Sequence, residues 1–177
     1  MKKITVKLNR KNGFTIVELL VAMAIFIAAV SIASAGFARA LRSQKAVVAL
    51  MAANDNASLS IEQMAREIRT GYNFCAGGLS CSASELTFVN ANNYVVTYRW
   101  NAADAAIERG LENANFQKFT ADNVRVVNLR FAVSGNQTGD GAPPRVTVIM
   151  GVGAKSQGVE NVVVNVQTTV SARLLDT

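Results

Sequence analysis

The pattern of apolar and polar positions separates an N-terminal apolar stretch from the rest of the chain. Residues 14–37 are almost entirely apolar, contain no proline and carry one charged side chain, that of Glu18. As a helix, these 24 residues would be about 36 Å long, which is enough to cross the ~30 Å hydrocarbon layer of a membrane. The pattern therefore predicts a membrane-spanning helix that begins at Phe14.

The helical pattern continues over residues 38–70, which contain no glycine or proline and are rich in Ala, Arg, Leu and Met. Residues at alternating steps of three and four share one face of a helix. We expect this face to pack on the remainder of the protein as core, with one polar interruption at Asn54. Its members are Val47, Leu50, Asn54, Ala57, Ile61, Met64 and Ile68.

After Gly71 the helical period gives way to short segments rich in β-branched and aromatic residues. Strands are expected at 85–90, 93–100, 124–133, 145–152 and 160–174, whereas 105–120 is ambiguous. We therefore predict an α+β protein in which one long helix, from Phe14 to about Thr70, packs on a C-terminal antiparallel sheet. In this division residues 71–177 form the globular β-rich domain.

The positive charge of the chain is concentrated before Gly13. The formal net charge is +6, but Lys2, Lys3, Lys7, Arg10 and Lys11 all precede Gly13 and no acid accompanies them. The rest of the chain has 18 − 5 = 13 basic and 12 acidic residues, a net charge of +1. A basic segment before an apolar helix holds an N-terminus on the cytoplasmic side of a membrane. The charge thus indicates topology, and we do not expect nucleic acid as a partner.

Three kinds of processing fit this N-terminal segment. A secretory signal peptide could be cut at the small residues Ala33-Ser34-Ala35, and an uncleaved anchor would keep Met1. Neither accounts for Glu18, because a carboxylate in a membrane-spanning helix costs on the order of 2 to 3 kcal/mol. The third possibility is a cut between Gly13 and Phe14, which would create a cationic amine close to that carboxylate.

The stretch KNGFTIVELLVAMAIF, residues 11–26, resembles the prepilin signature of type IV pilins and type II secretion pseudopilins. The resemblance implies a pilin fold and a cytoplasmic leader, residues 1–13, that a prepilin peptidase removes after Gly13 before methylating the amine of Phe14. It also implies that Glu18 pairs with the terminal amine of a neighbouring subunit during assembly. The implied partners are the membrane, the peptidase, other pilin or pseudopilin subunits and an assembly platform protein.

Two further details bear on this resemblance. Ala35 stands where many type IV pilins have a helix-breaking proline, so local melting of the helix is less expected here. The segments QMAREIRT, YRWN and IERG loosely resemble the minor pseudopilin J group of type II secretion. The implied location is the inner or cytoplasmic membrane, with one pass, the N-terminus inside and the globular domain outside, followed by a pilus or pseudopilus.

Cys75 and Cys81 form a close pair around Gly77 and Gly78, which permit a tight reversal of the chain. A disulfide is feasible if this domain lies outside the cytoplasm, and two free thiols are the alternative. Closing so short a loop would contribute about 2 kcal/mol in the chain-entropy model.

Other chemistry has little support in the sequence. Histidine is absent, and Glu108 and Glu112 would share a face only if their segment were helical. The loop 134–144 offers one carboxylate, Asp140, where a calcium site usually needs several. We expect no enzymatic activity, metal or cofactor. The alternative to a structural subunit is a membrane-anchored extracytoplasmic binding module that does not polymerise.

Overall fold

The computed structural model describes residues 13–137, 142–156 and 158–173. By their internal contacts, residues 1–44 and 45–177 form two compact units, each described here by itself. The helix α1 (Ile16–Arg69) contributes to both. Over its described residues, the first unit consists of residues 13–15 and of the helix as far as Gln44, and the second combines residues 45–69 with all the strands.

The helix α1 is 54 residues long and starts two residues later than the sequence predicts. Thr15 lies just before it and caps it, because its Oγ1 accepts a hydrogen bond from the backbone N–H of Glu18 at 3.2 Å. The helix continues through Ala35 and Gly36 without a break, in agreement with the missing proline. It ends at Arg69, and the N–H of Gly71 bonds back to the carbonyl of Ile68 at 3.1 Å.

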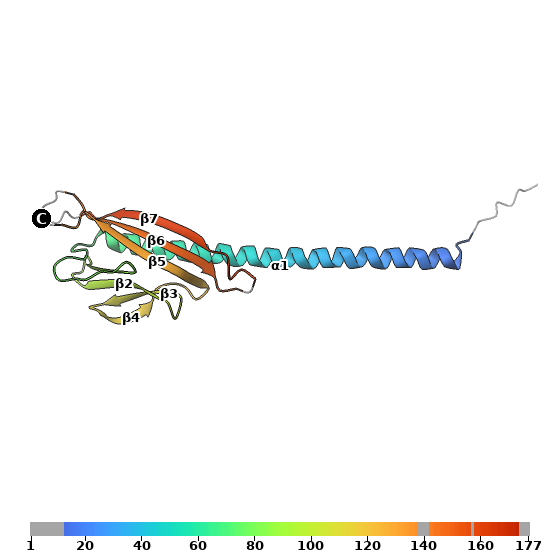
Figure 1. The fold of residues 1–177 in the computed structure, drawn as a ribbon, viewed down its shortest axis with the longest axis horizontal. Coiled ribbons are helices and arrows are strands. Elements are labelled where there is room, and N and C mark those ends of the chain that lie inside the picture. Colours follow the sequence, from blue (N-terminus) through green and yellow to red (C-terminus); the bar gives the residue numbers. More distant parts are fainter. Residues whose placement is uncertain (1–12, 138–141, 157, 174–177) are drawn as a thin grey trace, which may run out of the picture. The chain divides into compact units, whose positions relative to one another are not determined.

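The strands form two antiparallel sheets, and the second runs along the C-terminal part of α1 (Figure 1). This confirms the α+β class. The first sheet has the order β1-β2-β3-β4 and the second β5-β6-β7. Their strands are β1 (Glu85–Val89), β2 (Val95–Asn101), β3 (Ala106–Leu111), β4 (Ala114–Lys118), β5 (Val124–Ser134), β6 (Arg145–Ala154) and β7 (Val164–Ser171).

The expectation of a single sheet is wrong, because β5 has a strand partner on one side only. It pairs with β6 along ten residue pairs. On its other side it receives isolated bonds, in which the N–H groups of Phe131 and Val126 donate to the carbonyls of Ala83 and Ala105 at 2.9 and 2.7 Å. Residues 83 and 105 lie outside the strands, so these bonds join the two sheets without forming a ladder.

The ambiguous segment 105–120 is a hairpin of β3 and β4. Leu111 pairs with Ala114, and the two residues between them, Glu112 and Asn113, have φ angles of 53° and 55°. Two consecutive positive φ angles define a type I′ turn, whose twist matches that of the strands it joins. Glu108 lies in β3 and Glu112 in the turn, so the helical pairing of these two carboxylates does not arise.

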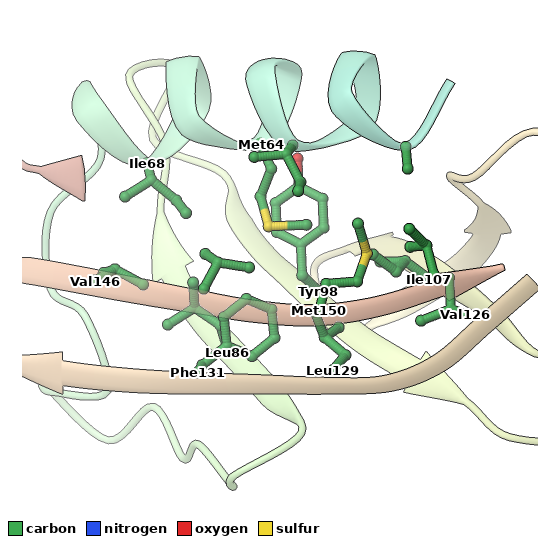
Figure 2. Close-up of a cluster of buried hydrophobic side chains, with 14 of the residues drawn as sticks. Met64, Ile68, Leu86, Tyr98, Ile107, Val126, Leu129, Phe131, Val146 and Met150 are labelled. Atoms are coloured by element: carbon green, nitrogen blue, oxygen red, sulfur yellow. The ribbon is translucent and has the colours of Figure 1, made fainter. Parts of the chain in front are cut away.

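One hydrophobic core joins α1 to both sheets in the second unit. Figure 2 shows Met64 and Ile68 extending from the helix toward strand residues that include Leu86, Phe131 and Met150. Stacked aromatic rings extend this core, with the ring centroids of Phe74 and Phe88 5.1 Å apart. The ring of Tyr98 follows at 6.3 Å from that of Phe88.

The buried face of α1 differs from the predicted stripe toward the N-terminal end of the second unit. Ala57, Ile61, Met64 and Ile68 are buried as expected, and Leu50 is partly buried. Val47, however, is 46 % exposed, and Ala53 takes the buried place next to Asn54. Alternating steps of three and four repeat every 3.5 residues, whereas a helix turns every 3.6, so the error grows by about 20° per heptad.

Candidate processing and assembly segment

The peptide bond between Gly13 and Phe14 lies in an open stretch before α1. Both residues are exposed, and a Cβ added to Gly13 would meet no atom within 4 Å. The Phe14 side chain is 81 % exposed. Within the described part of the first unit, nothing covers the bond at which the sequence predicts a cut.

Glu18 is the third residue of α1 and belongs to its N-terminal cap. Thr15 and Glu18 have the spacing of a capping box, in which the threonine side chain bonds the backbone N–H of the glutamate. A carboxylate in the first turn also interacts favourably with the positive end of the helix dipole. The pattern Thr-x-x-Glu is present in the sequence, so this local role could have been predicted from it. Among the described residues, the Glu18 carboxylate takes part in no ion pair.

The apolar part of α1 is uncovered in the first unit. It is long and apolar enough to cross a membrane, by length and composition. The large side chains here that are at least half exposed are those of Phe14, Ile16, Val17, Leu19, Leu20, Val21, Met23, Ile25, Phe26, Ile27, Ile32 and Phe37. A surface of this kind is stable in lipid or against other apolar helices, not in water.

Cys75 and Cys81 are joined by a disulfide, with their Cα atoms 5.4 Å apart. Gly77 and Gly78 turn the loop between them with φ angles of 64° and 89°. The loop is fastened to β1 through Thr87, whose carbonyl accepts from the N–H of Cys75 at 3.1 Å. The N–H of Thr87 in turn donates to Sγ of Cys81 at 3.2 Å. The disulfide thus holds the loop against one edge of the first sheet.

Glu67 anchors the C-terminal end of α1 to the first sheet, a role that sequence patterns did not reveal. Its carboxylate accepts two hydrogen bonds from Arg109, at 2.6 and 3.0 Å, one from the hydroxyl of Tyr98 at 2.6 Å and one from the amide of Asn90 at 3.2 Å. Desolvation raises the pKa of Glu67, but the bonds from Arg109, Tyr98 and Asn90 outweigh it and leave the pKa below its ordinary value. These partners lie 23 to 42 residues away in the sequence.

A polar cleft of about 210 Å³ separates the disulfide loop from the β3–β4 hairpin, with Leu79 and Phe116 among its lining residues. The Arg99 guanidinium lies 3.5 Å from the ring centroid of Phe116 and 2.7 Å from the carboxylate of Glu108. Hydrogen bonds from Asn101 and Arg99 lower the pKa of Glu108, although desolvation raises it. The bond from Asn101 has the larger effect on this pKa. The arginine in the cleft is therefore already paired within the protein.

Within the described ranges, no group of three or more Cys, Asp and Glu side chains is arranged to hold a metal ion. Asp140, the one carboxylate of the loop 134–144, lies outside the described residues.

Comparison with known protein families identifies the N-terminal segment. Residues 8–34 match the family model for the prokaryotic N-terminal methylation motif. The chain is thus an α+β protein that carries an N-terminal methylation motif at the start of a long apolar helix. The motif includes Gly13, Phe14 and Glu18, and it agrees with the resemblance to type IV pilins and pseudopilins. No curated protein and no solved structure matches the chain.

Proposed function

We propose that this chain is a prepilin-type structural subunit of a type IV pilus or a secretion pseudopilus. In this proposal it is cut after Gly13, methylated on the new amine of Phe14 and assembled through the apolar part of α1. The observation that carries the proposal is the methylation motif at residues 8–34, placed at the start of a helix whose apolar side chains are uncovered.

The chemistry of processing follows from the position of the cut. Hydrolysis between Gly13 and Phe14 removes the basic leader and leaves a cationic amine at the start of the apolar helix, four residues before Glu18. Alone in lipid, each of the two charges is costly. Their pairing between staggered neighbouring helices would offset that cost, because two unit charges 4 Å apart attract by about 4 kcal/mol at an effective dielectric constant near 20.

The same pairing would select the register of assembly. A neighbouring helix in another register would leave the amine and the carboxylate of Glu18 without partners, so it would be disfavoured. The disulfide of Cys75 and Cys81 supports a location of the second unit outside the cytoplasm, where disulfides persist. This agrees with a single-pass orientation in which the basic N-terminus stays inside.

The second candidate is a membrane-anchored binding module that does not polymerise, and the polar cleft beside Phe116 favours it. The two functions differ in what surrounds the apolar part of α1. A structural subunit exchanges lipid for other helices, whereas an anchored module remains in the membrane.

The N-terminal residue of the membrane-extracted protein tests the proposal. The chain is expressed with a prepilin peptidase, and its N-terminus is sequenced and its intact mass measured. A methylated Phe14 supports the proposal, a start at Gly36 means a secreted protein, and an intact Met1 means a plain anchor. Recovery of the processed chain in sheared filaments then separates a structural subunit from an anchored module.

A further inference from the structure

Two of the four sheet edges are closed by neighbouring backbone in the described part of the chain. At β1, Tyr72 forms a β-bridge with Val89, and the disulfide loop bonds Thr87. At β5, Phe131 and Val126 donate to carbonyls of the first sheet's connections, as described above. Neither edge presents a free row of backbone donors and acceptors to another chain.

The edge at β4 is short and charged. The strand has five residues and ends at Lys118, which pairs with Asp122. Short edge strands that carry a lysine are a common protection of natural sheets against pairing with another chain, because a foreign strand would have to desolvate the charge.

The edge at β7 has none of these protections. The strand pairs with β6 alone, and its described residues make no backbone hydrogen bond on the other side between Val164 and Ser171. No charged residue and no proline occurs from Asn161 to Ala172. Val162, Val163 and Val164 are 39–42 % exposed at the start of this edge. An antiparallel edge strand directs about half of its N–H and C=O groups outward, so an open ladder site extends over about 27 Å.

We propose that β7 is a pairing surface for β7 of a second copy of this chain, in antiparallel orientation. Two three-stranded sheets would thereby become one six-stranded sheet. This proposal goes beyond the proposed function and does not depend on it. Antiparallel pairing reverses residues 45–69 of α1 in the copy, so this association is distinct from the parallel packing of helices proposed above.

The residues of β7 favour a second copy as the partner. Because the strand is uncharged, it meets no like charge when it pairs with itself, which a strand containing Lys or Glu would do. Side chains alternate between the two faces of a sheet, so a pairing that keeps both core faces on one side places Gln167 or Thr168 opposite itself. The outward amides and hydroxyls of Asn165, Gln167 and Thr169 then face uncharged polar groups of the copy.

The first test measures the oligomeric state of the full-length chain in detergent micelles by light scattering over a micromolar concentration range. The wild type is expected to dimerise, and Gln167→Lys to raise the dissociation constant about tenfold or more, because two lysines would meet near the dyad. Gln63→Lys is the matched control, since Gln63 is exposed and belongs to α1, not to β7. It should leave dimerisation unchanged.

Covalent trapping provides an independent second measurement. Under mild oxidation Gln167→Cys or Thr168→Cys should give a disulfide-linked dimer on a non-reducing gel, while Gln63→Cys should not, with the native disulfide verified by mass. A monomeric wild type, a dimer that both lysine variants weaken equally, or the absence of trapping in both Gln167→Cys and Thr168→Cys would each overturn the proposal. Equal weakening would assign the association to the apolar helix instead.

Discussion

At the scale of single residues, Glu18 and Glu67 show how one helix uses carboxylates in two ways. Glu67 accepts four hydrogen bonds and is 19 % exposed, so its charge is fully paired. Glu18 has a helix cap beside it and, among the described residues, no cation. The fold of the second unit explains the role of the Glu67 carboxylate. The Glu18 carboxylate has no cationic partner among the described residues, so the fold of this chain alone does not explain its charge.

Substitution of Glu18 separates its charge from its helix cap. Glu18→Ala removes the whole carboxylate but keeps the backbone N–H that Thr15 caps, while Glu18→Gln removes the charge and keeps a side chain suited to a capping box. If the carboxylate pairs with a neighbouring amine, both variants should be cut and methylated, but each should reach sheared filaments at about a tenth of the wild-type amount or less. Quantitative immunoblotting of filament and membrane fractions measures this. Wild-type assembly of Glu18→Gln would contradict the charge pairing.

Glu67→Gln should destabilise the second unit by about 2 to 4 kcal/mol, because Arg109 would be left partly buried without its counter-charge. Since the folded pKa of Glu67 is lowered, its contribution is fully present above the ordinary glutamate pKa and is lost as pH falls through the folded value. The wild type should thus lose more stability than the variant below about pH 4.5.

The measurement is thermal unfolding in detergent between pH 7 and pH 3. Glu62→Gln serves as the control, because Glu62 pairs with Arg66 on the exposed surface of the same helix. An exposed pair of this kind contributes little to stability, because water screens its charges. Equal effects of the two substitutions would show that the Glu67 network does not anchor the helix.

At the scale of elements, the junction of α1 with the first sheet depends on the close approach of the Gly71 backbone to the Phe88 ring. A Cβ added to Gly71 would lie 2.5 Å from Cδ2 of Phe88. The Phe88 ring is buried and stacks between Phe74 and Tyr98, so it has little room to move. The end of the helix can therefore reach β1 only through a residue without a side chain.

Gly71→Ala should accordingly cost about 2 kcal/mol and lower the melting temperature by about 6 °C. Gly36→Ala is the matched control, since a Cβ there meets no atom within 4 Å and alanine favours a helix. The melting temperature of the second unit should not fall in that variant. Differential scanning calorimetry of both proteins checks the contrast, and an unchanged Gly71→Ala protein would refute the close packing.

At the scale of the whole molecule, processing would change the electrostatic character of the chain. Removal of residues 1–13 takes away five basic residues and no acidic one, so the formal charge falls from +6 to +1. The precursor and the mature chain should therefore separate clearly by isoelectric focusing as well as by mass.

Gly13→Leu should abolish this change if a peptidase cuts after the glycine. A bulky side chain at the exposed position before the cut would leave the precursor in the membrane with all of its leader charge. Focusing and intact-mass measurements on cells with and without the peptidase distinguish the two forms. Gly36→Ala again provides a control that should be processed normally, and normal processing of Gly13→Leu would count against the assignment of the cut.

Local patterns in the sequence predict the long helix and most strands, because the spacing of apolar residues within a short window distinguishes helices from strands. The β3–β4 hairpin was missed, since its turn is Glu112-Asn113 instead of a familiar glycine-containing pair. The division into two sheets and the Glu67 network depend on contacts between distant residues, which no local period records. In the candidate site, the Thr-x-x-Glu pattern is enough to predict that Thr15 caps the helix. The open edge of β7, by contrast, could be found only from the fold.

The contribution of α1 to the core also fixes an order of events in time. Ile68 is synthesised 154 − 68 = 86 residues before Ala154, the last residue of β6. At a synthesis rate of about 5 to 20 residues per second, β6, the central strand of the second sheet, is completed roughly 4 to 17 seconds after Ile68. The face of α1 that enters the core is therefore synthesised before every strand of the two sheets that cover it, and its protection during synthesis must come from the membrane, a chaperone or transient local structure.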